Sequence, residues 1–279
     1  MDKYTDVNST SYVGDNPVDT VFADVLTRSI VLFVNPDKVV PGGSNLPTET
    51  AIDSFPVRVE YGKTEDISCV NNSRTEECRP LIGGISIREQ SKIGTTPFDT
   101  LGYKATYNGN IGFVLAGHSA VANLKYIIQP YDENKVVGQV QRICWSDIDG
   151  CDGDFAWARA ATGISVYDDI CMGQTACSGA YDISSKRADS GQTLGTFVIK
   201  SGAASGNTLG EVNGNSPNSN YNTAKIPVTF GDSGSPIFWE SGSNADLFGV
   251  ITAKLGADYA KYWPQDYVET KIGAVAQTT

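Results

Sequence analysis

The sequence predicts a mostly β protein: an all-β sandwich or barrel with a C-terminal helix, preceded by a small N-terminal α/β unit. Its 279 residues include 29 glycines and 13 tyrosines, a balance typical of β-rich proteins with many turns. From Leu81 onward, short strand-like runs are separated by Gly, Asn and Asp turns, with almost no helical periodicity between them. A chain of this length suits one large or two unequal domains.

The N-terminal unit, residues 1–64, is predicted from three segments. Asp19–Arg28 predicts a helix, because apolar residues recur in it at helical spacing: Val21, Phe22, Val25 and Leu26. Ser29–Asn35 predicts a buried strand, and the alternation of Pro56–Tyr61 predicts a second. The unit is too short to bury much core alone, so we expect it to dock on something larger, as a propeptide, a regulatory unit or a permanent flank.

The larger domain, residues 81–279, follows a disulfide-bearing linker, residues 65–80. Its predicted strands share an apolar run bounded by turn residues: Gly84–Ile87, Leu101–Thr106, Ile111–Ala116, Lys125–Pro130, Lys135–Val140, Phe155–Arg159, Leu194–Lys200 and Phe248–Ala253. After Pro264, apolar residues recur at i, i+4 and i+7 and predict a terminal helix: Val268, Ile272 and Val275.

The charge balance argues against several classes of partner. Lys and Arg number 21 against 32 Asp and Glu, which gives a net charge of -11. Phosphate binding is carried by clustered Lys and Arg, so we expect no nucleic acid partner. The longest apolar runs, such as Ile30–Val34, are far shorter than the roughly 20 residues of a membrane span, so we expect no transmembrane segment.

The six cysteines fall in near pairs along the chain: Cys69 and Cys78, Cys144 and Cys151, Cys171 and Cys177. Many connectivities are compatible with six cysteines, so sequence alone does not prove the pairing, but we expect a disulfide within each neighbouring pair. No CxxC spacing is present and there is one histidine, which leaves little to ligate a transition metal; we expect no metal and no cofactor. Disulfides imply an extracytoplasmic protein. The first twelve residues do not resemble a signal peptide, so we expect that a leader has been removed.

Two segments carry residues with catalytic potential. The only histidine, His118, ends the apolar run Phe113–Ala116 beside small residues. Ser233 lies in the run Gly-Asp-Ser-Gly-Ser-Pro, residues 231–236, which predicts a tight glycine-flanked loop before a strand. Backbone N–H groups of such a loop can converge where an acyl oxyanion forms. A serine hydroxyl needs a base to become a nucleophile, and His118 is the only imidazole available.

Together, Ala-Gly-His at residues 116–118 and the serine motif at 231–236 resemble the chymotrypsin-like serine peptidases, especially the bacterial branch whose serine motif ends in Ser-Pro. The resemblance covers roughly residues 81–275. It implies a double six-stranded β-barrel, with His118 as the base and Ser233 as the nucleophile. Ser119 stands where many members have a disulfide-forming cysteine, and Ser235 replaces the commoner second glycine of the motif.

The family order of His, Asp and Ser requires an aspartate between residues 118 and 233. The candidates include Asp132, Asp147, Asp149, Asp152, Asp154, Asp168, Asp169, Asp182 and Asp189. We favour Asp154, because it begins the alternating run Asp154–Ala158 and resembles the family's Asp-x-Ala segment; Asp152 is the second choice. The acidic run at residues 147–154 could instead be a calcium loop, but its spacing does not fit the EF-hand pattern.

The resemblance also implies further roles. The N–H groups of Gly231 and Ser233 form the oxyanion hole, and the charge of Asp232 is met by a cation. That cation is a newly cleaved N-terminus in trypsin and an internal arginine in compact bacterial members. Leu81–Gly84 resembles an activation junction, so both sources stay open, although we favour an opening strand with a glycine bend as the interpretation of this segment.

Substrate specificity follows from residues near the serine. The resemblance places the pocket for the residue before the scissile bond between two segments: Pro227, Val228 and Phe230, and Thr252, Ala253 and Lys254. Pro227 stands where trypsin-type enzymes carry an aspartate, so we expect no preference for cleavage after Arg or Lys. Small apolar or acidic residues are expected instead, with Lys254 either a cation for an acidic residue or a solvated side chain.

The sequence thus predicts a secreted, monomeric serine endopeptidase that acts on protein or peptide substrates through His118, Asp154 and Ser233. The alternative is a catalytically inactive binding or adhesion protein on the same fold. Retention of all three residues favours the enzyme.

Overall fold

The computed structural model describes residues 18–24, 29–34, 51–52, 55–61, 68–94, 98–174, 176–215, 220–256 and 258–279. The chain divides into two compact units, residues 1–66 and 67–279. The segment 68–80, expected as a linker, therefore lies within the second unit.

The described part of the first unit is a four-stranded sheet of order β1-β2-β4-β3. Its strands are β1 (Val18–Asp24), β2 (Ser29–Val34), β3 (Ala51–Ile52) and β4 (Phe55–Tyr61). The strands expected at 29–35 and 56–61 are confirmed, apart from Asn35, which lies outside the described residues. The helix expected over Asp19–Arg28 is wrong over residues 19–24, which pair antiparallel with β2. Val18, Val21 and Phe22 favour a strand once a partner strand is available.

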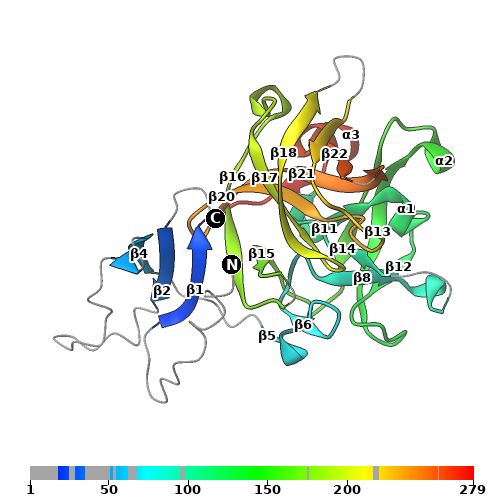
Figure 1. Cartoon of the computed structure of the whole chain (residues 1–279). Helices are drawn as coiled ribbons and strands as arrows, with labels where there is room; N and C mark the ends of the chain where they lie inside the picture. The colour runs from blue at the N-terminus through cyan, green and yellow to red at the C-terminus, as the bar shows by residue number, and fades with distance from the viewer. Residues whose placement is uncertain are drawn as a thin grey trace. The chain divides into compact units, whose positions relative to one another are not determined.

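The second unit begins with an eight-stranded sheet that curls without closing, of order β23-β10-β11-β14-β13-β12-β8-β9 (Figure 1). Its strands are β8 (Ser86–Glu89), β9 (Asp99–Thr100), β10 (Lys104–Tyr107), β11 (Asn110–Ala116), β12 (Tyr126–Ile128), β13 (Val136–Trp145), β14 (Asp154–Ala160) and β23 (Val275–Ala276). Short helical segments connect them: η4 (Gln90–Lys92), α1 (Gly117–Ala120) and α2 (Ser146–Asp149).

The other half of this unit is a six-stranded barrel, closed because β20 pairs with both β17 and β21. Its strands, in barrel order, are β20 (Pro236–Ser241), β17 (Phe197–Gly202), β18 (Gly206–Asn215), β19 (Asn222–Lys225), β22 (Tyr259–Pro264) and β21 (Asn244–Leu255). The sheet continues from β21 through three more strands: β16 (Gly179–Lys186), β15 (Val166–Met172) and β7 (Leu81–Gly83). A 3-10 turn, η5 (Asp189–Gly191), precedes the barrel strands.

A two-stranded ribbon, β5 (Ser68–Cys69) and β6 (Cys78–Arg79), opens the unit, with η3 (Val70–Asn72) between its strands. Disulfides join Cys69 to Cys78, Cys144 to Cys151 and Cys171 to Cys177, the three neighbouring pairs along the chain. Cys69, Cys78, Cys171 and Cys177 all belong to the buried cluster that packs around the curled sheet. A second buried cluster fills the barrel.

The C-terminal helix α3 (Gln265–Ile272) begins after Pro264, as expected, and lies beside β21 and β22 (Figure 1). It buries Val268 and Ile272 and ends at Gly273, so Val275 is not helical but pairs with β10 in β23. Each of the eight strands predicted in the larger domain overlaps a strand of the structure, but Gly84 and Ile85 lie in a bend before β8, and residues 101–103 precede β10. The helices of the described residues include none long and apolar enough to cross a membrane.

Candidate active site

His118 lies in α1, immediately after β11, where the neighbouring strand brings Asp154 to it. β11 pairs antiparallel with β14 so that Ala116 opposes Phe155, which leaves Asp154 beside the turn that carries the histidine. One carboxylate oxygen, Oδ1, accepts a hydrogen bond from the backbone N–H of His118 at 2.8 Å. The other, Oδ2, lies 2.9 Å from Nδ1 of the ring. With Nδ1 bonded to a carboxylate, the neutral ring has its acceptor nitrogen at Nε2.

The surroundings of His118 favour its charged form. The side chains of His118 and Asp154 are 33% and 19% exposed, so the pair is open to a ligand on one side. Burial alone would lower the pKa of His118. The hydrogen bond and charge of Asp154, and the charge of Asp99, outweigh burial and Lys92, so the pKa of His118 is raised above its ordinary 6.5.

Asp99 and Lys92 are neighbours of His118 that the sequence did not reveal. Asp99 lies in β9, and the Lys92 ammonium donates a hydrogen bond to the carbonyl oxygen of His118 at 2.8 Å. Burial raises the pKa of Asp99, while the charges of His118, Lys92 and Arg88 oppose that shift. The charge of a second carboxylate, carried by β9, therefore also acts on the imidazole.

The loop that carries Ser233 is fastened to the curled sheet through β9. The N–H of Thr100 donates to the carbonyl of Ser233, and the Thr100 hydroxyl donates to the carbonyl of Gly231, each at 2.7 Å. Gly231 and Gly234 have φ values of 98° and 92°, which favour glycine and explain the motif's spacing. The loop of the barrel and the strand that faces His118 are thus one hydrogen-bonded assembly.

Among residues 231–235, two backbone N–H groups have no acceptor in the described part of the chain. Those of Asp232, Gly234 and Ser235 donate to backbone carbonyls, whereas those of Gly231 and Ser233 donate to no group in the described part of the chain. They are the two N–H groups assigned to the oxyanion hole from sequence. Within the same residues, no hydrogen bond joins the Ser233 hydroxyl to His118, a contact that often tightens only when substrate binds.

Asp232 is buried and pairs with a lysine, a cation that the sequence did not indicate. Its carboxylate lies 3.2 Å from the ammonium of Lys200 in β17, and the two side chains are 1% and 0% exposed. The N–H of Thr229 and the hydroxyl of Ser205 also donate to this carboxylate, at 2.9 and 2.7 Å. Burial lowers the pKa of Lys200, and Asp232 opposes that shift. Leu81, at the segment that resembles an activation junction, is fully buried in β7.

Arg74, which the sequence did not single out, fixes the segment 68–80 to the barrel. Its guanidinium donates to the hydroxyl of Ser201 at 2.7 Å and to the carbonyls of Gly84 and Gly173 at 2.9 and 2.5 Å. Burial lowers its pKa to about 10, although Asp232 opposes the shift. The disulfide-bearing segment is therefore packed beside the Lys200–Asp232 pair.

The residues expected to bind substrate divide into exposed and buried groups. The side chain of Phe230 is 87% exposed, and Pro227 and Lys254 are exposed as well. Val228 packs in the barrel core, and the Thr252 hydroxyl accepts a hydrogen bond from the buried indole of Trp263 at 3.2 Å. Ala253 is half-buried. Among the described residues, no group of three or more His, Cys, Asp or Glu side chains is arranged to hold a metal ion.

No protein-family model and no curated protein matches the sequence. Solved structures do match. A glutamic-acid-specific serine protease shares 21% identity at a TM-score of 0.55, over 71% of this chain and 100% of its own. Protease A from Thermobifida fusca shares 18% at 0.56, and a Nocardiopsis protease shares 18% at 0.53, each over 71% of this chain and 99% of its own. The fold is therefore that of chymotrypsin-like serine proteases, as the sequence motifs predicted.

Proposed function

We propose that this chain is a secreted serine endopeptidase that cleaves peptide bonds through an acyl-enzyme. The observation that carries the proposal is the hydrogen-bonded His118–Asp154 pair, in a fold shared with serine proteases, together with the two unoccupied N–H groups of the serine loop. A base, its orienting carboxylate and an anion-binding loop are the parts that acyl transfer needs.

In the proposed mechanism, His118 takes the proton of the Ser233 hydroxyl as its oxygen attacks the scissile carbonyl. Asp154 holds Nδ1 of the ring and stabilises the imidazolium that forms. The N–H groups of Gly231 and Ser233 stabilise the oxyanion, and loss of one such donor costs about 10²–10³ in rate in a comparable hydrolase. His118 then gives the proton to the leaving amine, and water releases the acyl group by the same steps.

We further propose that the enzyme does not prefer Arg or Lys before the scissile bond. Pro227 supplies no carboxylate to the pocket, and the exposed Phe230 and Lys254 offer an apolar wall and a cation. Small apolar or acidic residues fit such a pocket better. One structural neighbour is specific for glutamic acid and uses a histidine triad to bind substrate, but a chain with a single histidine cannot build that triad.

For the domains, we propose that residues 1–64 are a propeptide, regulatory unit or flank, and that the peptidase domain, predicted over residues 81–279, also includes the segment 68–80 that packs within the same compact unit. Because Asp232 pairs with Lys200, we propose that activation does not depend on a newly cleaved N-terminus. Three disulfides support an extracellular, oxidising location. We expect a monomer that binds protein or peptide substrates and no nucleic acid.

Hydrolysis of a mixed peptide library by the full chain tests this function. We expect cleavage by wild type and by the control Ser241→Ala, which changes an exposed serine of β20, and none by Ser233→Ala. Residual activity of Ser233→Ala within about tenfold of wild type would refute the serine mechanism. A folded wild type that cleaves nothing would favour the inactive binding protein.

A further inference from the structure

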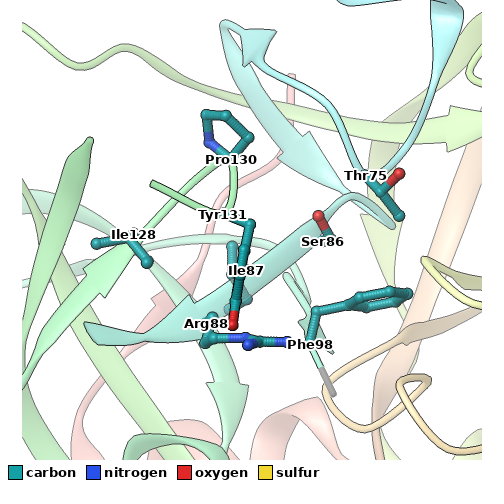
Figure 2. Close-up of a pocket in the computed structure, with 8 residues that line it drawn as sticks. All are labelled: Thr75, Ser86, Ile87, Arg88, Phe98, Ile128, Pro130 and Tyr131. Carbon is teal, nitrogen blue, oxygen red and sulfur yellow. The ribbon is translucent and has the colours of Figure 1, made fainter. Parts of the chain in front are cut away.

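A pocket of about 240 Å³ lies on the curled sheet. It is separate from the residues assigned to the acyl side of the substrate, which is the part before the scissile bond. Figure 2 shows its walls, which combine aromatic, aliphatic and polar side chains with one arginine: Thr75, Ser86, Ile87, Arg88, Phe98, Ile128, Pro130 and Tyr131. The proposed mechanism uses none of these residues. A mostly apolar pocket with a few polar groups is the usual form of a ligand site.

Arg88 is the unusual member of this pocket. Its side chain lies in β8 and is only 8% exposed, and its guanidinium carbon lies 3.9 Å from the centre of the Tyr131 ring. Its buried Nε has no hydrogen-bond partner. In the described part of the chain, no salt bridge joins Arg88 to a carboxylate: the charge of Asp99 acts on Arg88 only from beyond ion-pair distance, and the neighbouring Glu89 carboxylate accepts from Ser91. Burial of a cation without a direct ion pair is costly, which points to an anion supplied by a ligand.

Phe98 connects this pocket to the candidate active site. A Cβ placed on Gly231 would lie 3.1 Å from Cε2 of Phe98, so the ring packs against the proposed oxyanion loop. Phe98 also immediately precedes β9, the strand that holds Ser233 through Thr100. The residues assigned to the acyl side all belong to the barrel half, whereas the strands that line the pocket belong to the curled sheet. The pocket therefore adjoins the other side of the scissile bond.

We propose that this pocket is a leaving-group subsite that binds a carboxylate through the Arg88 guanidinium, an inference that rests on the proposed endopeptidase function. The carboxylate is either an Asp or Glu side chain within the first few residues after the scissile bond or the free C-terminus of a short peptide. Arginine suits this task because its planar fork matches a carboxylate. The apolar part of the substrate residue that carries this carboxylate would pack against Phe98, Ile128 and the Tyr131 ring.

The test uses internally quenched peptides that share one cleaved bond and differ only after it. In one set of pairs, Asp is compared with Asn at the first, second or third position after the cleaved bond. In a further pair, a peptide that ends in a free carboxylate is compared with the same peptide ending in an amide. In one of these pairs, we expect kcat/KM of the peptide with the carboxylate to exceed that of its neutral counterpart by about tenfold. The position or the terminus that shows the effect identifies the source of the carboxylate.

Two substitutions assign the preference to Arg88. In Arg88→Met the preference should disappear, while hydrolysis of an ester substrate with no residues after the scissile bond stays unchanged. Arg142→Met is the matched control, since this exposed arginine of β13 also lies over a tyrosine ring.

Three outcomes separate the possibilities. For each pair of peptides, the wild-type kcat/KM of the carboxylate form is compared with that of its neutral form. If the two agree within about twofold for every pair, the subsite proposal is wrong, even if the variant fails to fold. A preference that survives in folded Arg88→Met would overturn it as well. If wild type hydrolyses neither peptides nor the ester, the endopeptidase proposal fails, and the subsite fails with it.

Discussion

Two carboxylates of this fold hold a cationic or basic group, and they differ mainly in their access to solvent. Asp154 binds the ring of His118, and that pair is 19% and 33% exposed. Asp232 binds the ammonium of Lys200, and that pair is 1% and 0% exposed. A base must reach its substrate and exchange protons, whereas a fully buried ion pair can only hold a shape. The comparison supports the proposed roles, which are proton transfer for the first pair and support of the serine loop for the second.

The two pairs also belong to different halves of the second unit. His118 and Asp154 are carried by the curled sheet, and Asp232 and Lys200 by the barrel and the loop before it. Thr100 of β9 joins the halves through its hydrogen bonds to Gly231 and Ser233. A change to either pair should therefore alter catalysis, but by different routes.

The largest expected effect among these pairs is that of Asp154→Asn. The amide can still hold the ring, but it favours the wrong tautomer and does not stabilise the imidazolium, so kcat should fall by about 10⁴ with the fold retained. Steady-state kinetics and circular dichroism check this. A fall of less than about tenfold would remove Asp154 from the proposed triad.

Lys200→Met should have the next largest effect, and it acts on stability as well as rate. It leaves Asp232 buried without its cation, which is expected to cost about 3–5 kcal/mol of unfolding free energy. Because the serine loop loses its support, kcat should also fall, by about 10²–10³. Lys200→Arg keeps the charge and is the control for urea unfolding and kinetics. Equal stability of Lys200→Met and wild type would contradict the structural role.

The pH profile sharpens the comparison, because it reports the protonation of His118. kcat/KM should rise along one acid limb with an apparent pKa above 6.5, since Asp154 and Asp99 raise the pKa of His118. The same shift stabilises the folded chain below pH 6.5, and that contribution is lost as the pH rises through the raised pKa. A profile that is flat from about pH 5 to 8 would contradict a histidine base.

The smallest expected effect is that of Asp99→Asn. Its charge raises the pKa of His118 less than Asp154 does, so its removal should move the acid limb to lower pH by a smaller amount than Asp154→Asn. The kcat at high pH should change little. The check is kcat/KM against pH for both variants; an equal or larger shift in Asp99→Asn would reverse the ranking of the two carboxylates.

Local patterns in the sequence were sufficient for much of this fold. The apolar run before His118 and the alternation after Asp154 both predicted strands, and the pairing of β11 with β14 explains why those residues meet. The same reasoning failed where one pattern fits two structures. Val21 and Phe22 suit either a helix or a strand, and the choice depended on pairing with β2. Val275 continued a helical spacing past Gly273, where the helix ends.

The partners that no local pattern indicated are those joined by long-range packing. Lys200 is 32 residues from Asp232 in number, Arg74 reaches Ser201 across 127 residues, and the charge of Asp99 acts on His118 from another strand. Each is an ordinary charged residue in its own segment. Only the closure of the barrel and the curl of the sheet give these residues their partners.

Covalent labelling with a fluorophosphonate tests the central claim most directly, because it requires an activated serine and no knowledge of the substrate. Intact mass and peptide mapping should show one adduct per chain, on Ser233. Ser233→Ala should not label, and His118→Gln should label far more slowly. An adduct on another residue, or none on the folded wild-type chain, would contradict the assignment of His118, Asp154 and Ser233.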